Sequence, residues 1–452
     1  MSKPRADSLR VRQDGAIVDF RFDDRMMRGV AGEPIAAALH ANGVRTLSRS
    51  FKYHRPRGLH CVADACPNCA MRVNGLQGVT TCVTPLRAGD DVRREHAWPS
   101  ADASVLGVLD RTSRLAPLGF QYRRMRKSPR LFHRWERVLA RLAGHGTLPA
   151  DDVAAAVLHR AEWATLGIDV AVVGAGPAGL AAALAAAEAG ASVLVIERDR
   201  QLGGYLLAGA SDDRRVAAEL ADRAARHPAI EVADGATAIG WYAEGILGVS
   251  AAGRFTEVRP RSVVLATGTH ERRWAFEDSD RPGVFLGYGA QRLLNRYGVR
   301  PGATMVVATD EPYGYELAAQ LAAGGVSVAA LVDARPMSAI GDEQVARLAD
   351  AGIALRAGER PKRVLRRGLR VGLQIVDRDM RRTDIDVDAV ALAGGRRPAL
   401  ELLHQRAASG GFQLASAVRA DHWWVAGGAG GTTTVPAAFQ SGTTAGRAAA
   451  GC

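Results

Sequence analysis

The chain of 452 residues is too long for one ordinary hydrophobic core, so two or three domains are expected. Hydrophobic residues make up 47% of it, which excludes an intrinsically disordered protein. The formal net charge of +12 would suit nucleic acid, but the sequence has no nucleic-acid-binding motif and only 6% aromatic residues. The charge is better explained by acidic partners or phosphate-bearing cofactors, and no nucleic-acid partner is predicted.

Two stretches bear on location. Residues 1–15 are polar and contain no apolar run, which predicts no signal peptide and a cytoplasmic protein. Residues 170–187 are uncharged, but they are rich in Gly and Ala and contain Pro177. A strand, a turn and a helix explain this stretch better than a membrane span, so no span is predicted.

Residues 1–100 are predicted to form a small β-rich domain. Apolar residues in 16–22 indicate a strand, and 34–41 reads as a helix with proline in its first turn. Residues 70–73 and 79–83 are predicted to be short strands that flank two glycines. The order of strand, helix, cysteine loop and strand is compatible with a ferredoxin-like β-grasp, and we expect this domain to have a core of its own.

A basic and aromatic loop, residues 49–58, lies before the cysteines. It could be a solvated loop. It could also be a docking loop for a flavin phosphate or for a partner protein, because the fork of an arginine side chain suits phosphate.

Four of the five cysteines are close together at Cys61, Cys66, Cys69 and Cys82. The spacing C-x4-C-x2-C followed by a later single cysteine is the plant-type ligand pattern of a [2Fe-2S] cluster, with the last ligand expected on a neighbouring strand. Structural zinc usually takes two close pairs of ligands, so a zinc site is the weaker alternative, and buried or disulfide-bonded cysteines are a third.

Residues 101–165 are predicted to be a connector with a basic run at 123–127. Apolar residues recur at helical spacing in 131–142, which indicates an amphipathic helix that packs on the body of the protein. A helix lying on a membrane surface is the alternative.

The strongest motif after the cysteines begins in an apolar strand at residue 168. Gly174, Gly176 and Gly179 form G-x-G-x-x-G, an Ala-rich helix and a second strand follow, and Glu197 ends that strand. The first two glycines permit a tight turn and close approach of a pyrophosphate, the third permits close helix packing, and Glu197 can bond ribose hydroxyls. The unit therefore predicts dinucleotide binding at a helix N-terminus.

Later segments indicate the kind of dinucleotide fold. Thr267 and Gly268 end a strand after a hairpin-like region, 230–258, as in flavoproteins with two dinucleotide-binding domains. A final helix, 436–450, would point its N-terminus at a flavin ring. Such flavoproteins usually carry a ribityl-binding Asp where this chain has Gly428, which leaves FAD, NAD and other adenine nucleotides open.

A second nucleotide-like unit spans residues 304–333 but lacks the glycine triplet. Asp310 and Glu311 occupy its turn, where carboxylates would repel a pyrophosphate, so a degenerate domain is favoured over a working NAD(P)H site. No CxxC pair lies outside the cysteine loop, since the remaining cysteine is Cys452. His270 and Glu271 are the only obvious acid/base candidates near a flavin, and a structural role is favoured for them, so no catalytic residue is assigned.

The predicted fold class is a multidomain α/β and α+β protein, in which a β-grasp [2Fe-2S] domain precedes a flavoprotein body with two dinucleotide-binding domains. Residues 166–300 and 394–452 are expected to form the cofactor-binding domain, and 301–393 the degenerate one. The predicted cofactor-binding residues are Gly174, Ala175, Gly176, Gly179, Glu197, Arg198, Gly203, Gly204, Thr267, Gly268, Gly428 and Thr434.

Taken in this order, the motifs resemble the family of α subunits of heterotetrameric sarcosine oxidase, opine and D-hydroxyproline dehydrogenases and hydrogen cyanide synthase. The most specific matches are residues 49–58, 98–100 and 119–122. The resemblance implies a glycine-oxidase-like β subunit that carries the substrate chemistry, a possible small γ subunit, and a heterotetramer or larger assembly. It also implies FMN at the subunit interface and an adenine dinucleotide at 174–179.

Sarcosine oxidase α subunits lack the cluster cysteines in this loop and extend into a folate-binding domain, whereas this chain keeps all four cysteines. An oxidoreductase acting on CH–NH groups of an opine or cyclic imino acid is therefore favoured over a sarcosine-demethylating one. The leading hypothesis is an electron-transfer subunit that passes electrons through FMN and [2Fe-2S] to an external acceptor. The alternatives are a self-contained NAD(P)H-dependent ferredoxin-type reductase and an assembly scaffold with a structural nucleotide.

Overall fold

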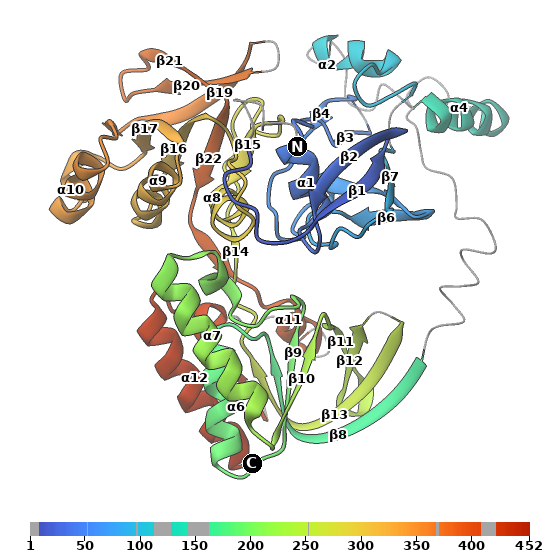
Figure 1. Cartoon of the computed structure of the whole chain (residues 1–452), viewed down its shortest axis with the longest axis vertical. Helices are drawn as coiled ribbons and strands as arrows, with labels where there is room; N and C mark the ends of the chain where they lie inside the picture. The colour runs from blue at the N-terminus through green and yellow to red at the C-terminus, as the bar shows by residue number, and fades with distance from the viewer. Residues whose placement is uncertain are drawn as a thin grey trace. The chain divides into compact units, whose positions relative to one another are not determined.

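The computed structural model describes residues 9–51, 53–95, 98–112, 128–142, 162–251, 253–367, 370–407 and 422–452. It divides into two compact units. The first unit is Met1–Val153 with Arg273–Gly395, and the second unit is Ala154–Arg272 with Arg396–Cys452 (Figure 1).

The N-terminal part of the first unit is a five-stranded sheet in the order β2-β1-β7-β5-β6, with helix α1 packed beside it. Strand β1 pairs antiparallel with β2 and parallel with β7, and a short β3–β4 ladder lies apart from this sheet. The strand predicted at 16–22, the helix at 34–41 and the strand at 70–73 are confirmed. The bounds are β1 Ile17–Phe22, β2 Arg25–Val30, α1 Ile35–Ala41, β3 Ser48–Arg49, β4 Pro56–Arg57, β5 Ala70–Val73, β6 Leu76–Thr80 and β7 Asp91–Arg93.

The strand predicted at 79–83 is wrong in register. Strand β6 is Leu76–Thr80, so it begins and ends earlier than the predicted strand. It begins early because Asn74 and Gly75, both with positive φ, form a two-residue turn that pairs Val73 with Leu76. Asn-Gly is a strong sequence signal for such a hairpin. Residues 81–83 form a turn, so Cys82 lies in a turn and not on the strand that was expected to carry it.

The rest of the first unit contains a parallel sheet in the order β15-β22-β16-β17-β18 and an antiparallel β19-β20-β21 sheet. The predicted second nucleotide-like unit is present as β16, α9 and β17. The bounds of the helices are α2 Val108–Thr112, α4 Pro129–Leu142, α8 Gly287–Gln291, α9 Tyr313–Ala323 and α10 Asp342–Asp350. The strands are β15 Val284–Leu286, β16 Thr304–Thr309, β17 Ser327–Asp333, β18 Leu355–Ala357, β19 Arg360–Arg367, β20 Arg370–Val376, β21 Arg382–Val387 and β22 Ala389–Ala393.

The helix expected at 131–142 is confirmed as α4. Leu131 and Val138 of its apolar face are 54% and 47% exposed, so its packing on the body of the protein stays a prediction. The basic run at 123–127 and the 119–122 motif lie outside the described residues. No helix in the described ranges is both long and apolar enough to cross a membrane.

The N-terminal sheet does not have the separate core that was expected. One cluster of buried side chains runs from Phe20, Leu39 and Met71 around the cysteines to Phe285 and Leu331 in the parallel sheet. Since apolar side chains from both sheets pack into one core, folding of the cysteine region and of the nucleotide-like region is coupled.

A buried ion-pair seam joins the same two regions. Arg281 donates two hydrogen bonds of 2.6 Å to the carboxylate of Asp110 on α2. Arg55 and Arg57 of the basic loop pair with Asp278 and Asp280. The side chains of Asp110 and Arg281 are only 4% and 6% exposed, so each charge depends on its partner for stabilisation.

The second unit is built on a sheet in the order β10-β9-β8-β13-β12-β11, with β24 also paired to β13. Strands β10, β9, β8, β13 and β24 are parallel, whereas β11, β12 and the start of β13 form an antiparallel meander. The meander matches the expected hairpin-like region. The strands are β8 Glu162–Val173, β9 Val193–Glu197, β10 Ile230–Asp234, β11 Thr237–Tyr242, β12 Ile246–Ala251, β13 Arg254–Leu265, β14 Thr269–Glu271, β23 Arg396–Pro398 and β24 Trp423–Val425.

Alternate residues of β8 enter two different cores, as the two faces of a strand require. Val170 and Val172 pack against α6 and α12, whereas Ala171 and Val173 pack with the meander and Leu402 of α11. Helices α6, α7 and α12 lie side by side in Figure 1. Their bounds are α6 Pro177–Glu188, α7 Ser211–Arg226, α11 Glu401–Ala407 and α12 Val435–Ala450. These two units confirm the predicted fold class.

We expect Asp110→Asn to lower the free energy of unfolding by about 3 kcal/mol, because it leaves buried arginine charge without its carboxylate. Burial alone would raise the pKa of Asp110, but hydrogen bonding and charge from Arg281 outweigh it and hold the pKa below its usual value. The carboxylate therefore adds stability above about pH 4, and this contribution is lost as pH falls through the lowered pKa.

Urea unfolding at pH 7 and pH 3 measures the effect. The difference between Asp110→Asn and wild type should shrink at the lower pH. Asp19→Asn is the control, because its carboxylate is 64% exposed in a surface pair with Arg28 and should change stability by less than about 1 kcal/mol. Equal stability of Asp110→Asn and wild type at pH 7 would contradict the role of the seam.

Candidate functional site

The four clustered cysteines converge in the first unit. Cys61, Cys69 and Cys82 are buried, Cys66 is half-buried, and all are free thiols. The sulfurs of Cys61 and Cys66 lie 3.4 Å apart, and Cys69 is hydrogen-bonded to Cys82. In the described residues no group of three or more His, Cys, Asp or Glu side chains meets the arrangement for a single metal ion. Cys82 is also hydrogen-bonded to Cys61, so the four thiols form one connected group, as the ligands of a shared cluster must.

The loop backbone also fits a bound cluster. Val62 and Asp64 have φ of 50° and 55°, and a buried β-branched residue in this region is strained. The strain turns the Ala65 N–H toward the sulfur of Cys61 at 3.3 Å. Hydrogen bonds from Cys66, Cys82 and backbone amides lower the pKa of Cys61, and the same bonds to Cys61 raise the pKa values of Cys66 and Cys82.

The cysteine loop lies directly on β15 and α8. The Leu286 N–H donates to the carbonyl of His60 at 2.9 Å, and His60 Nδ1 lies 2.8 Å from the carbonyl oxygen of Val284. A Cβ on Gly289 would lie 2.7 Å from the His60 oxygen and 2.9 Å from that of Cys61. Gly289 is therefore the residue that allows the loop backbone to approach α8, and its isolated position in the sequence gave no signal of this.

We expect Cys66→Ser to lower the iron content and abolish the iron–sulfur absorption. Because the loop shares its core with the nucleotide-like sheet, the first unit should also lose thermal stability. The second unit has cores of its own and should keep its fold and its nucleotide.

Iron analysis, visible absorption and calorimetry on the purified chain test this expectation. Cys452→Ser is the matched control, since Cys452 is exposed at the last position and should change none of the three. A full iron–sulfur spectrum in Cys66→Ser would show that the ligand assignment is wrong.

The glycine-rich turn of the second unit lies between β8 and α6. Gly174 has φ of 100° and a Cβ there would lie 2.5 Å from the carbonyl oxygen of Ala266, while a Cβ on Gly179 would overlap the carbonyl oxygen of Gly174. Gly176 differs from both, because its Cβ would meet nothing closer than Gly204 at 4.0 Å. The protein's own packing leaves space at Gly176, which is where a pyrophosphate approaches the backbone in this motif.

Two other predicted residues, Gly203 and Gly204, lie against this turn. Gly203 donates its N–H to the carbonyl of Ala175 at 2.8 Å, and a Cβ on Gly204 would lie 2.8 Å from the Cα of Gly176. The loop after β9 is thus brought against the glycine-rich turn, whereas Arg198 is exposed.

Glu197 lies at the end of β9 and holds the turn in place. One carboxylate oxygen accepts from the N–H of Ala175 at 2.7 Å and the other from that of Asp199 at 2.8 Å. Burial raises the pKa of Glu197 despite these bonds. Its expected contact with ribose hydroxyls stays a prediction, and its bond to Ala175 adds a role in shaping the turn.

The remaining predicted cofactor residues have identifiable structural roles. Thr267 donates to the carbonyl of Ala399 at 2.5 Å, and Gly268 accepts from the N–H of the same residue at 3.0 Å. Thr434 caps α12 by accepting from the N–H of Ala437. A Cβ on Gly428 would lie 2.9 Å from the Thr269 side chain, so the structure gives little room there for the Asp that flavoproteins usually carry.

His270 and Glu271 lie on the short β14–β23 ladder. His270 pairs with Glu401 of α11 through Nε2 and Oε1 at 3.0 Å. This pairing links two elements of the second unit and suits the structural role that was favoured.

Two glycine substitutions separate nucleotide binding from folding. Gly176→Ala should leave the melting temperature of the nucleotide-free protein nearly unchanged and weaken dinucleotide binding, because the added methyl group enters open space. Gly179→Ala should destabilise the second unit, because the same methyl group overlaps backbone.

The bound nucleotide content and the melting temperature of both variants check this pair. Equal destabilisation by the two changes, or unchanged nucleotide content in Gly176→Ala, would contradict the assignment of the turn as the nucleotide site.

The acid at the end of the second nucleotide-like unit is engaged within the protein. Asp333 is fully buried, accepts from the hydroxyl of Tyr315 at 2.7 Å and pairs with Arg335 at 2.7 Å. Burial and the neighbouring Asp333 raise the pKa of Tyr315. The carboxylate that would bind a ribose in a working site is therefore already occupied by protein donors.

Sequence reasoning missed several charged and polar residues that the structure brings together. Asp110, Asp278 and Arg281 form the seam, and Ser104 and Arg366 line a pocket with Arg49. Their partners lie far away in the sequence, 171 residues in the case of Asp110 and Arg281, so no local pattern identifies them.

Comparisons with known proteins agree with these sites. Residues 168–442 match the family model described as pyridine nucleotide-disulphide oxidoreductase, and residues 15–97 match that of a 2Fe-2S iron-sulfur cluster binding domain. The second match favours an iron–sulfur cluster over zinc at the cysteines.

The chain is similar to several curated relatives, including the following two. It is 34% identical to the alpha chain of sarcosine oxidase from Rhizobium meliloti (strain 1021), over 94% of this chain and 45% of the relative. It is 32% identical to an opine oxidase subunit from the same organism, over 38% of this chain and 40% of that one. The chain thus spans less than half the length of these relatives.

Among solved structures, that of L-proline dehydrogenase from P. horikoshii matches with a TM-score of 0.65 and 22% identity, over 98% of this chain and 75% of that one. At this identity the match supports the fold.

Proposed function

Because the chain belongs to the pyridine nucleotide-disulphide oxidoreductase family, we propose that this oxidoreductase is the electron-transfer α subunit of a multi-subunit flavin-dependent dehydrogenase. Its substrate class is an amine or imino acid, such as an opine, D-hydroxyproline or a sarcosine-like compound. The observation that carries the proposal is a cysteine quartet that shares one core with the nucleotide-like sheet of a flavoprotein fold.

The cysteine loop gives the chain its role in the complex. When bound at the four cysteines, a [2Fe-2S] cluster supplies one-electron transfer. The chain's own residues hold it in place: the Ala65 N–H is directed at the Cys61 sulfur, and Gly289 lets the loop rest on α8. The buried sulfurs and their packing exclude water from all ligands except the half-buried Cys66, so electron exchange with an external acceptor is expected near Cys66.

The second unit would hold an adenine dinucleotide at residues 174–179. The N-terminus of α6 provides partial positive charge for a pyrophosphate, and Gly176 provides the space. FAD is the favoured ligand because of the family, but the lack of room at Gly428 keeps NAD and other adenine nucleotides in consideration.

The substrate chemistry is assigned to a partner. The acid/base candidate His270 is paired with Glu401 and joins two elements of the second unit, so no catalytic residue is assigned to this chain. A glycine-oxidase-like β subunit would oxidise the substrate and pass electrons through FMN at the interface between the two proteins, with a γ subunit possible. The names of the relatives support this, since each is a subunit of an oxidase.

A self-contained NAD(P)H-dependent reductase is the second candidate. It would need the nucleotide-like unit of the first unit to bind NAD(P)H, but Asp333 there is bound to Tyr315 and Arg335. This arrangement favours the partner-fed subunit.

Anaerobic titration of the purified chain discriminates the two candidates. We expect dithionite to bleach the flavin and the cluster, and NADH and NADPH to leave both oxidised over the same minutes. The chain alone should also show no turnover of sarcosine, proline or opines.

Rapid reduction of the cofactors by either nicotinamide would establish the reductase instead. Substrate-dependent bleaching of the isolated chain would also contradict the proposal. A spectrum unchanged even by dithionite would point to a scaffold.

A further inference from the structure

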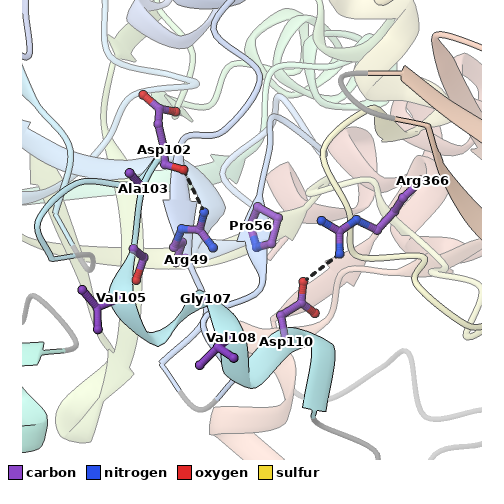
Figure 2. Close-up of a pocket in the computed structure, with 10 residues that line it drawn as sticks. Arg49, Pro56, Asp102, Ala103, Val105, Gly107, Val108, Asp110 and Arg366 are labelled. Atoms are coloured by element: carbon purple, nitrogen blue, oxygen red, sulfur yellow. Dashed lines mark hydrogen bonds and ion pairs between the residues drawn. The ribbon is translucent and has the colours of Figure 1, made fainter.

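A pocket of about 450 Å³ opens in the first unit, a size typical of sites for small organic molecules. Figure 2 shows Arg49 and Arg366 reaching into it from different walls, with Pro56 between them. Its walls come from the basic loop, from the segment leading into α2, and from β19. The lining residues are Arg49, Pro56, Asp102, Ala103, Ser104, Val105, Gly107, Val108, Asp110 and Arg366.

Arg49 is fixed in place by backbone alone. Its guanidinium donates to the carbonyl oxygens of Ala101 at 2.6 Å, His54 at 2.7 Å and Asp102 at 3.4 Å. These bonds involve three of its five N–H groups, and no ion pair joins Arg49 to a carboxylate in the described part of the chain. Burial lowers the pKa of Arg49 below its usual value. The carboxylates of Asp110 and Asp102 oppose this shift and the like charges of Arg366 and Arg281 add to it, so a bound anion would stabilise the charge of Arg49.

The two carboxylates of the pocket are already bound to other arginines. Asp102 accepts two hydrogen bonds from Arg94, at 2.9 and 2.6 Å. Asp110 accepts two from Arg281 and pairs with Arg366 at 3.2 Å. The charges of both carboxylates favour the protonated form of Arg49, but among the described residues neither forms an ion pair with it.

The polar lining is completed by Ser104. Its hydroxyl lies 3.0 Å from Nδ1 of His54, a fully buried ring, which fixes the position of the hydroxyl. A preorganised guanidinium, a second guanidinium and a fixed hydroxyl are the groups that bind oxyanions in proteins.

We propose that this pocket binds a small organic molecule through an oxyanion, a phosphate ester or a carboxylate, held by Arg49 and Arg366. The other arginines of the basic loop have a different role, because Arg55 and Arg57 belong to the ion-pair seam. The inference does not depend on the proposed electron path, since it rests on the pocket alone.

Isothermal titration calorimetry on the full-length chain, with its cluster and nucleotide bound, tests the proposal with inorganic phosphate and with malonate as probes. We expect saturable binding of one of them at one site. Arg49→Gln and Arg366→Gln should each weaken this binding about tenfold or more, because each removes charge-assisted hydrogen bonds.

The control is Arg28→Gln, a surface arginine whose side chain is 73% exposed outside the pocket, which should bind the probe as wild type does. Arg49 also donates hydrogen bonds to three carbonyl groups, so the Arg49→Gln variant could fail to fold. The side chain of Arg366 is half exposed on β19, so Arg366→Gln should fold and keeps the test decisive in that case. Preference for phosphate identifies a phosphate ester and preference for malonate a carboxylate, and both support the proposal. Absence of saturable binding, or equal weakening in Arg28→Gln, would overturn it.

Discussion

The backbone of the cysteine loop lies so close to α8 that Gly289 has no room for a side chain. This approach places the four thiols on the parallel sheet of the first unit and makes one core of two regions that the sequence suggested were separate. The ion pairs of Asp110, Arg281 and Arg55 connect the same two regions. Because apolar packing supplies most of the stabilisation and the buried charges hold the two regions in one arrangement, we expect the cysteine loop to move together with the sheet.

That rigidity has a consequence for function. A redox centre on a mobile domain changes its distance to other centres, whereas this one is fixed relative to β15 and α8. In the nucleotide-like region, the acid at the end of β17 is bound to Tyr315 and Arg335, which agrees with the expectation of a degenerate site there. In the proposed account this region serves as a base for the cluster, and the dinucleotide belongs to the second unit alone.

The sequence predicted the features that depend on local spacing. The cysteine quartet and the G-x-G-x-x-G turn were recognisable because each is encoded within about twenty residues, and the strand and helix periods around them were readable. Features that depend on residues distant in the sequence could not be predicted. The shared core, the role of Gly289 and the pocket of Arg49 and Arg366 arise from contacts that no local pattern encodes. Two local features were also missed: strand β2, which pairs with β1 through a two-residue turn, and the position of β6, although Asn74-Gly75 signals its turn.

Electron paramagnetic resonance of the native complex, co-purified with its partner chains and mixed anaerobically with an amine or imino-acid substrate, tests the central claim most directly. The account predicts a reduced [2Fe-2S] signal in the complex and none in this chain alone treated in the same way. A cluster that stays oxidised in a complex whose partner flavin is fully reduced by substrate would contradict it.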